Sequence, residues 1–346
     1  MTLSFDYLVY IGRFQPFHKG HQEILRRALE KSAKVIVVLG SAHRARNIKN
    51  PFSDDERRQM ILTAMEDAMP GAGGRIIFCP LRDYYNDDKW VPAVREAVAK
   101  AAPSSTRIGI IGHDKDDSSY YLHKFPDWQW VSEENYHGLS ATDLRRFWFS
   151  ASDEEAWKRL AVATPASVLS FLKEFRESPA YADLAGEFSA VEEGKAAWSS
   201  APYPPVFVTV DAVVRCKGHV LMVKRGGLPG RGQWALPGGF VEQNERLREA
   251  SIRELAEATG LGVSADVLRA SLVDRDVFDH PDRSVRGRTI THGFFFDVAA
   301  DELPAVVGAD DAVEARWVLI DELVGMETAI FDDHLHIVNR FLKVLA

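Results

Sequence analysis

The chain has 346 residues, a length that suggests two domains. Hydrophobic residues make up 46% and charged residues 27%, as in globular proteins, and the net charge of −8 argues against broad binding to nucleic acid or anionic membranes. The N-terminus lacks a signal-peptide pattern and no apolar run reaches the roughly 20 residues of a membrane span. We therefore expect a cytoplasmic protein without a nucleic-acid or membrane partner, in which Cys79 and Cys216 are ordinary reduced thiols.

The first half of the chain alternates short apolar runs with amphipathic stretches. Buried strands are predicted at the runs Leu8–Ile11, Val35–Leu39, Ile76–Cys79 and Ile108–Ile111. Helices are predicted between them, at His21–Glu30, Asp54–Met69 and Val91–Ala101, the second with a capping-box pattern at Ser53 and Glu56. This alternation predicts an α/β domain with a doubly wound parallel sheet, which binds ligands at the carboxyl ends of its strands.

The alternation of strands and helices ends before the middle of the chain, and a different pattern begins near residue 206. Two further helices are expected at Ala141–Phe149 and Pro165–Phe175, followed by a Ser-, Gly- and Pro-rich connection from about residue 177 to residue 205 that could hold a short helix. Strands are then predicted at Val206–Arg215, Val220–Lys224 and Thr289–Val298, with one strong helix at Glu245–Ala258. We expect an α/β domain over residues 1–180, a linker over 181–204 and an α+β domain over 205–346.

The first predicted strand runs directly into a turn rich in glycine, histidine and cations. The turn contains Gly12, Arg13, Phe14, Gln15, His18, Lys19 and His21, and the next helix then begins. Backbone amides at a helix N-terminus face an anion, while imidazole and cationic side chains stabilise charge that develops on a phosphate. This strand-to-helix turn therefore predicts a polyphosphate site.

A second segment with phosphate chemistry lies far downstream. Ser140 can cap a helix whose first turns hold Thr142 and Arg145, which places hydroxyls and a guanidinium at one helix N-terminus. Ser140 on its own would also be an ordinary N-cap.

The two segments, His18-Lys19-Gly20-His21 and Ser140-Ala141-Thr142-Asp143-Leu144-Arg145, resemble the marks of the nucleotidyltransferase superfamily. The longer string Gly12–His21, with 40–42 and 49–57, resembles the archaeal-type NMN adenylyltransferases in particular, over roughly residues 5–175. The resemblance implies a Rossmann-like domain that makes NAD and pyrophosphate from NMN and ATP, with Mg²⁺ on the triphosphate and no covalent intermediate. It implies catalytic roles for His18, His21, Arg145, Arg13 and Lys19, and substrate binding by Gly12, Phe14, Gln15, Ser140 and Thr142.

Other candidate residues follow the later strands. In the resembled family a tryptophan stacks on the nicotinamide and an aspartate contacts the nucleotide, and Trp90 and Asp83 match them, although Trp90 could equally anchor the following helix in the core. Gly112 and Asp114 are candidates for adenosine or phosphate contacts, unless their loop is merely solvated. Arg46 could reach phosphate or be an ordinary surface residue.

The C-terminal half carries a spaced acidic motif. Gly239, Glu245 and the run Arg253-Glu254-Leu255-Ala256-Glu257-Ala258-Thr259-Gly260-Leu261 resemble the Nudix box. Glu254 and Glu257 share one helical face, and clustered carboxylates bind hard divalent cations that bridge a pyrophosphate. We expect a Mg²⁺ or Mn²⁺ site formed by Glu254, Glu257, the Gly238 carbonyl and Glu245. The family has a second glutamate where this chain has Ala258, which should weaken the site unless another carboxylate such as Glu314 compensates.

A later string over residues 274–292 resembles the ADP-ribose pyrophosphatase branch of the Nudix proteins. Its arginines, Arg286 and Arg288 among them, could bind the diphosphate of ADP-ribose, or the string could be a solvated hairpin. The order of the two halves resembles that of bacterial bifunctional NMN adenylyltransferase/Nudix hydrolases, whose small-molecule partners are ATP, NMN, NAD and ADP-ribose.

Three hypotheses remain. The first is a bifunctional enzyme that also cleaves ADP-ribose to AMP and ribose 5-phosphate. The second, favoured by Ala258, is an adenylyltransferase whose impaired Nudix domain only binds or senses such nucleotides. The third keeps the N-terminal fold but changes the acceptor to a phosphopantetheine or a cytidylyl acceptor. A homo-oligomer is compatible with the sequence, which also does not distinguish NMN from its deamidated acid.

Overall fold

The computed structural model describes residues 3–102, 107–113, 121–133, 138–150 and 154–345. They form two compact units, Met1–Leu184 and Ala185–Ala346. The boundary falls inside a 19-residue helix, α7, so most of the segment expected as a linker is helical. No helix of the described residues is long and apolar enough to cross a membrane.

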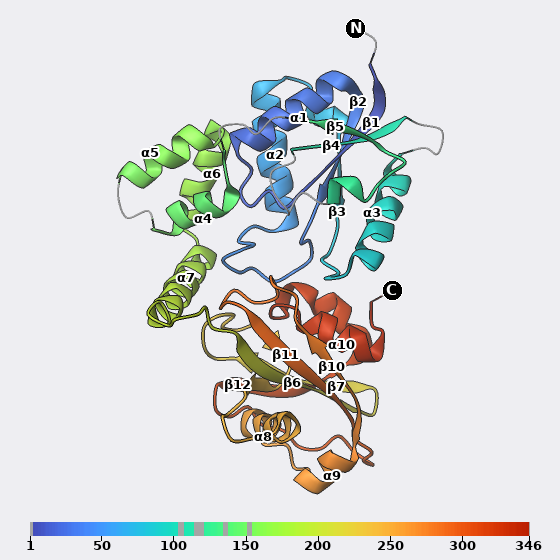
Figure 1. Cartoon of the computed structure of the whole chain (residues 1–346), viewed down its shortest axis with the longest axis vertical. Helices are drawn as coiled ribbons and strands as arrows, with labels where there is room; N and C mark the ends of the chain where they lie inside the picture. Colours follow the sequence, from blue (N-terminus) through green and yellow to red (C-terminus); the bar gives the residue numbers. More distant parts are fainter. Residues whose placement is uncertain (1–2, 103–106, 114–120, 134–137, 151–153, 346) are drawn as a thin grey trace. The chain divides into compact units, whose positions relative to one another are not determined.

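The first unit is built on a five-stranded parallel sheet with the order β3-β2-β1-β4-β5 (Figure 1). Its strands are β1 (Phe5–Gly12), β2 (Ser32–Leu39), β3 (Ile76–Pro80), β4 (Ile108–Gly112) and β5 (Gln129–Ser132). Its helices are α1 (Lys19–Lys31), α2 (Asp54–Ala68), α3 (Asp87–Ala101), α4 (Ala141–Ser150), α5 (Glu154–Ala163) and α6 (Ala166–Arg176), with the 3-10 helix η1 (Gly73–Arg75) and the start of α7 (Pro179–Ala197).

The predicted doubly wound sheet is confirmed. Alternate residues of β1 point to opposite faces, so Val9 and Ile11 join the apolar cluster that includes Val94 and Val98 of α3, whereas Tyr10 faces His21 of α1. The order of the strands reverses between β1 and β4, and a doubly wound sheet opens a ligand crevice at such a point.

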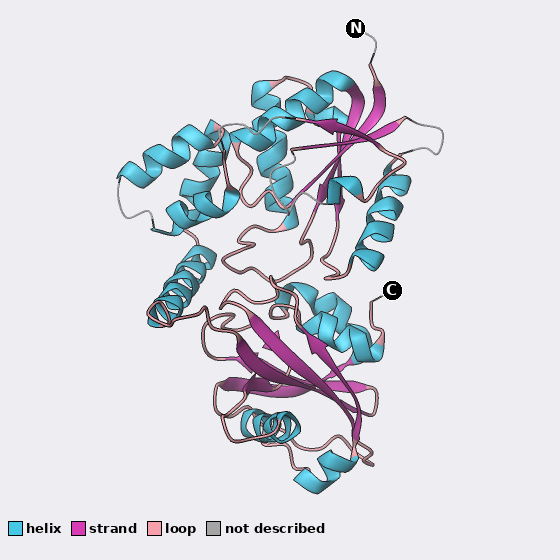
Figure 2. Ribbon diagram, viewed as in Figure 1, coloured by secondary structure: helices cyan, strands magenta, loops and turns pink. Residues whose placement is uncertain are grey.

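The second unit contains a mixed sheet with the order β10-β11-β6-β7-β12, and β8 and β9 pair with β7 and β6 (Figure 2). The strands are β6 (Phe207–Cys216), β7 (His219–Arg225), β8 (Trp234–Ala235), β9 (Gly238–Phe240), β10 (Leu272–Phe278), β11 (Thr289–Asp297) and β12 (Ala312–Leu319). The helices are α8 (Leu247–Thr259), α9 (Ala265–Ala270), η3 (Ile320–Ala329) and α10 (His334–Leu342).

Both faces of this sheet are covered, which confirms the α+β expectation. Val210, Ala212 and Val214 of β6 pack in a cluster with Leu255 of α8, while Val213, on the opposite face, packs in a cluster with α10. The helix α8 ends at Gly260, whose φ of 52° lies in the left-handed region that glycine adopts without strain. The helix α8 thus covers the face of the sheet that holds Val210, Ala212 and Val214, and it begins shortly after β9, which contains Gly238 and Gly239.

Candidate functional site

Two histidines cap the helix that follows β1. The His21 amide donates to Nδ1 of His18, and the His18 amide donates to Nδ1 of His21, each at 3.3 Å. This is a capping box with imidazoles in place of the usual hydroxyl and carboxylate. Because both Nδ1 atoms accept, the proton of each neutral imidazole lies on Nε2. The helix cap therefore fixes both rings as Nε2 donors.

His21 lies among aromatic rings. Its ring centroid is 3.6 Å from that of His18, 4.9 Å from Phe14 and 5.8 Å from Phe17. Burial, and secondly the proximity of His18, hold the pKa of His21 well below its ordinary value. The imidazole is therefore a neutral donor near pH 7, and the positive charge of this site must come from other residues.

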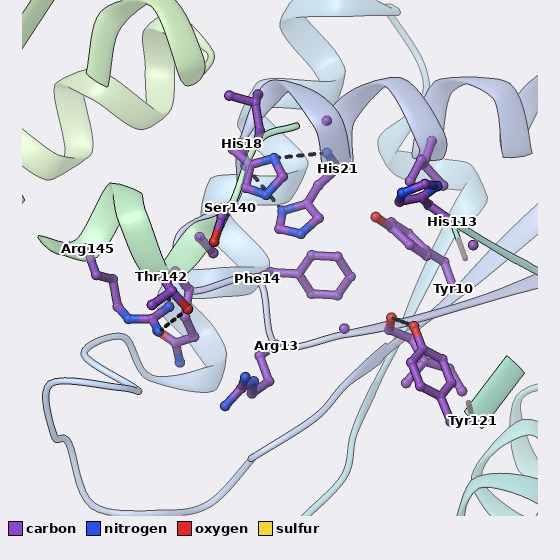
Figure 3. Close-up of a pocket in the computed structure, with 18 residues that line it drawn as sticks. Tyr10, Arg13, Phe14, His18, His21, His113, Tyr121, Ser140, Thr142 and Arg145 are labelled. Carbon is purple, nitrogen blue, oxygen red and sulfur yellow. Dashed lines mark hydrogen bonds between the residues drawn. The ribbon is translucent and has the colours of Figure 1, made fainter. Parts of the chain in front are cut away.

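That charge comes from two arginines. Arg145 of α4 is buried and donates to the Gln15 carbonyl at 2.6 Å and to the Thr142 hydroxyl at 3.2 Å (Figure 3). Burial, and then repulsion from Arg13, lower the pKa of Arg145 to about 10. Arg13 is exposed, so it is the buried Arg145, desolvated and repelled by Arg13, that an anion would stabilise most.

A cavity of about 270 Å³ joins these groups at the ends of β1 and β4. The predicted residues that line it are Gly12, Arg13, Phe14, Gln15, His18, His21, Gly112, Ser140, Thr142 and Arg145. His113, from the stretch after β4 in which adenosine or phosphate contacts were expected, lines it too (Figure 3). Tyr10 of β1 and Tyr121 also line it and were not predicted. Asp114 lies outside the described residues.

Buried contacts hold the loop between β1 and α1 in place. The Gln15 amide group donates to the Phe52 carbonyl at 2.9 Å and accepts from the Phe52 amide at 3.0 Å. Arg57, which is fully buried, donates to the carbonyls of Arg13 at 2.8 Å and Gly40 at 2.7 Å. Gln15 therefore braces the loop through its side chain, and Arg57 is a positioning residue that the sequence did not reveal.

Two predicted cations are engaged elsewhere. The Lys19 ammonium donates to the Val162 carbonyl at 2.7 Å, close to the end of α5. Arg46 forms a two-pronged ion pair with Glu56 and donates to the Pro51 carbonyl at 2.7 Å. Neither lines the cavity.

Asp83 and Trp90 lie beyond the end of β3, away from the cavity lining. Asp83 accepts from Ser41 at 3.0 Å and from Arg44 at 2.9 Å. The Trp90 ring meets Tyr121 and Phe125 edge-on at 6.0 and 5.9 Å and packs against the apolar cluster of the sheet. These contacts are compatible with an anchor for α3, and the contact of Trp90 with the nicotinamide ring stays a prediction.

In the second unit one arginine organises three glutamates. Arg253 donates to Glu245 at 2.6 Å, to Glu257 at 2.8 Å and to Glu254 at 2.9 Å. Burial raises the pKa of Glu254 although Arg253 lowers it, and the nearby carboxylates of Glu257 and Asp311 raise it further. Asp311, just before β12, was not predicted and belongs to this acidic group in place of Glu314.

The strand β9 lies close to these carboxylates. A Cβ on Gly239 would come within 2.5 Å of the Glu254 carboxylate, so a side chain there would displace that carboxylate. Both Glu245 oxygens accept from Arg253, whereas Glu254 and Glu257 each accept from it at one oxygen, so these two and the Gly238 carbonyl are the hard oxygen donors of the predicted set with oxygen left for a cation. Among the described residues no group of three or more His, Cys, Asp or Glu side chains is arranged to hold a metal ion.

Three further predicted residues of this unit are Ala258, Arg286 and Arg288, and the structure gives their contacts. Ala258 is buried in a small apolar cluster with Val223, Ala235 and Phe331. The Arg286 guanidinium lies 5.2 Å from the centroid of the Phe240 ring. Arg288 donates to the Asp279 carbonyl. Both arginines line a second cavity.

Comparisons with known proteins match both halves of the chain. Residues 9–147 match the family described as Cytidylyltransferase-like, and residues 205–341 match the NUDIX domain family. A nicotinamide/nicotinic acid mononucleotide adenylyltransferase of Acinetobacter baylyi is 43% identical over 190 residues, which cover 54% of this chain and 95% of that protein. An ADP-ribose pyrophosphatase of Methanocaldococcus jannaschii is 35% identical over 136 residues, which cover 39% of this chain and 73% of that protein.

One solved structure matches nearly the whole chain. A bifunctional NMN adenylyltransferase/ADP ribose pyrophosphatase from Francisella tularensis superposes with a TM-score of 0.92 at 38% identity, over 98% of this chain and 99% of that one. The same protein in complex with AMP and a manganese ion gives a TM-score of 0.90 at 37% identity over the same shares.

Proposed function

The chain belongs to the family of bifunctional NMN adenylyltransferase/ADP-ribose pyrophosphatases, and from this premise we propose that each unit carries one of the two activities. The first unit joins NMN to the adenylyl group of ATP and releases pyrophosphate. The second hydrolyses ADP-ribose to AMP and ribose 5-phosphate.

In the first unit an oxygen of the NMN phosphate attacks the α-phosphorus of ATP. A new P–O bond forms as the bond to the bridging oxygen of pyrophosphate breaks. The NMN phosphate is already ionised, so no strong general base is required, and catalysis consists of positioning and charge stabilisation. His18 and His21 donate from Nε2 to phosphate oxygens, while Arg13 and Arg145 stabilise the charge that develops on the leaving group.

The other predicted residues have supporting roles in this proposal. Gly12, Phe14 and Gln15 shape the loop, Gly112, Ser140 and Thr142 line the opposite wall, and Lys19 and Arg46 brace the neighbouring segments. Asp83 and Trp90 are assigned to the nicotinamide nucleotide on family resemblance alone. Asp114 is assigned to ATP on the same ground.

The observation that carries this function is the reciprocal histidine cap beside Arg145, at the point where the strand order reverses. The test is a product assay with NMN, ATP and Mg²⁺, in which NAD and pyrophosphate should form in equal amounts. Parallel reactions with the deamidated mononucleotide, with 4′-phosphopantetheine, and with CTP as donor determine the substrate class. Absence of NAD, or a better rate with another acceptor, would overturn the proposal.

In the second unit a water molecule attacks one phosphorus of the ADP-ribose diphosphate, and the P–O–P bond breaks. The residues fit a divalent cation: Glu254 and Glu257 supply hard oxygens, and burial raises the pKa of Glu254, with a smaller contribution from Glu257 and Asp311, so a cation would stabilise its charged form. When bound, such an ion would neutralise the diphosphate. Arg253 orients the glutamates, and Mg²⁺ or Mn²⁺ are the expected ions.

The alternative, a unit that only binds ADP-ribose, rests on Ala258. The assay that separates the two incubates the protein with ADP-ribose in Mg²⁺ or in Mn²⁺ and measures AMP. AMP formation that is lost in Glu254→Gln supports hydrolysis. Binding without AMP in either metal ion would favour the sensor.

A further inference from the structure

Two buried polar side chains of the second unit belong to neither candidate site. His334 begins α10, drawn in red in Figure 1, and Asp211 lies on β6; each is 6% exposed. Polar groups buried this deeply cost free energy unless they are hydrogen-bonded, so their partners indicate what they hold in place. Both reach the segment 236–239, which precedes the acidic helix α8.

His334 holds this segment by its backbone. Its Nδ1 accepts from the Leu236 amide at 2.9 Å, a buried contact between residues 98 positions apart. Because the amide is the donor, Nδ1 is unprotonated, and the proton of the neutral ring lies on Nε2. That nitrogen is 3.8 Å from Oδ1 of Asp211. His334 therefore joins α10 both to the segment 236–239 and to Asp211.

Asp211 contacts the same segment at Gly238. A Cβ on Gly238 would lie 2.7 Å from Oδ1 of Asp211 and 2.2 Å from the Val210 carbonyl oxygen, so a side chain there would force β9 away from β6. The other carboxylate oxygen of Asp211 accepts from the hydroxyl of Thr291, a fully buried residue, at 2.6 Å. The Asp211 carboxylate is thus held in place, and any shift of it would be transmitted to Gly238.

The pairing of β9 with β6 sets the direction of the Gly238 carbonyl. The Pro237 carbonyl accepts from the Ala212 amide at 2.8 Å, so it points toward β6. Successive carbonyls of an extended chain point to opposite sides, so that of Gly238 points away from β6, as a ligand of a cation must. Pro237 has no N–H, so the nearest amide before Gly238 that can anchor this path is that of Leu236. This is the amide that His334 binds.

We propose that His334 is a positioning residue for the hydrolase: it sets the path of the segment 236–239 and, through it, the place of the Gly238 carbonyl as a ligand of the divalent cation. The inference rests on the proposed hydrolase function of the second unit. His334 acts through the Leu236 amide and through Asp211, without touching the cation or the substrate. Hydrogen bonds that orient metal ligands typically change metal affinity or activity about 10- to 100-fold.

The test compares two amide substitutions with a matched control. In His334→Asn the side-chain oxygen can take the place of Nδ1 as acceptor, whereas in His334→Gln the amide group lies one methylene further out, toward the place of Nε2. Arg340→Ala is the control, because Arg340 belongs to the same helix, is exposed and forms an ion pair with Asp276.

Three measurements use the full chain. Electron paramagnetic resonance of free Mn²⁺ gives the Kd of Mn²⁺ without nucleotide, and calorimetry gives the Kd of ADP-ribose in EDTA. AMP release at saturating ADP-ribose gives the Mn²⁺ concentration for half-maximal activity. Metal or nucleotide bound to the first unit contributes equally to every variant.

We expect His334→Gln to raise the Kd of Mn²⁺ about tenfold, and to raise the Mn²⁺ concentration for half-maximal activity in parallel. His334→Asn should keep both values within about threefold of the wild type, because it retains the acceptor, and Arg340→Ala should resemble the wild type. The Kd of ADP-ribose in EDTA should stay within about twofold in all variants, which shows that the second unit is folded.

The outcomes separate this role from the hydrolase function. If no AMP forms but the Kd of Mn²⁺ still rises in His334→Gln alone, the hydrolase proposal fails and the positioning role stands. If AMP forms and His334→Gln binds Mn²⁺ no more weakly than Arg340→Ala, the role of His334 is overturned. An increase of about tenfold in the Kd of Mn²⁺ in His334→Asn would overturn it as well, and this arm decides even where His334→Gln does not fold.

Discussion

His18 both caps a helix and faces the cavity, and two substitutions separate these roles. In His18→Asn the side-chain oxygen can replace Nδ1 as acceptor for the His21 amide, because asparagine is a favourable N-cap residue. The Nε2 donor is lost. In His18→Ala both the cap and the donor are lost, so the difference between the variants measures the cap alone.

The expected magnitudes differ enough to be resolved. Loss of an N-cap acceptor costs about 1 kcal/mol of stability, and this should be seen in His18→Ala but not in His18→Asn. Loss of a preorganised donor to a developing oxyanion costs about 10²–10³ in kcat, and this should be seen in both. KM for ATP should change by less than about threefold, since the donor acts mainly in the transition state.

The assay measures NAD formation at saturating NMN and ATP, together with thermal unfolding of each variant. A normal kcat in His18→Asn would refute the assignment of the Nε2 donor and leave His18 as a helix cap only. Equal losses of stability in both variants would refute the view that Nδ1 serves as the cap acceptor.

Three further predictions concern single charges and protons. Glu254→Gln should abolish AMP formation from ADP-ribose and leave NAD synthesis within about twofold, because separate sites carry them; loss of both would contradict this. Arg145→Lys keeps the charge but not the two-pronged contact with Gln15 and Thr142, and should lower kcat for NAD at least about tenfold in the product assay. His21 and His334 have lowered pKa values, mainly through burial, so the unfolded chain binds more protons below pH 6.5. Stability should thus fall between pH 6.5 and pH 5, by up to about 1.4 kcal/mol per pH unit for each histidine, and unfolding midpoints independent of pH would contradict it.

Local patterns predicted the sheet and the main helices well. The alternation of apolar runs placed β1 to β4, and Ser53 with Glu56 forms the capping box that their spacing predicted. The edge strand β5, Gln129–Ser132, was missed because it is short and half-exposed, without the apolar run that marks an inner strand. Serine, glycine and proline around α7 predict a connection with at most a short helix, whereas the structure has a helix of 19 residues there.

Residue roles depended on contacts that local patterns do not contain. His18 and His21 follow β1, whereas Arg145 comes from α4 and is joined to the β1–α1 loop by its hydrogen bond to the Gln15 carbonyl. Lys19 turns to a carbonyl 143 residues along the chain, whereas Arg46 turns to Pro51 and Glu56 a few residues on. No local signal tells a cation that binds phosphate from one that braces a loop.

Trp198 illustrates the same limit from the opposite direction. Trp198 follows α7 in a segment whose composition predicts a connection. Only in the folded chain does its ring reach Phe207 and the second cavity, which Phe240 also lines.

The candidate sites of the two units share one electrostatic feature: a buried charged side chain lies near another group of the same charge. In the first unit Arg13 repels the buried Arg145 beside His21, whose pKa burial holds well below its ordinary value, so a bound anion would stabilise both guanidinium groups. In the second unit burial raises the pKa of Glu254, and the neighbouring carboxylates of Glu257 and Asp311 raise it further. A bound cation would therefore stabilise the charged form of Glu254. Both arrangements of charge are present in the folded chain before a ligand binds. This is the electrostatic preorganisation that phosphoryl chemistry requires. A phosphoanhydride with its metal ion carries both signs of charge. Its phosphates can reduce the repulsion between the arginines of the first unit, and its metal ion can reduce the repulsion between the carboxylates of the second.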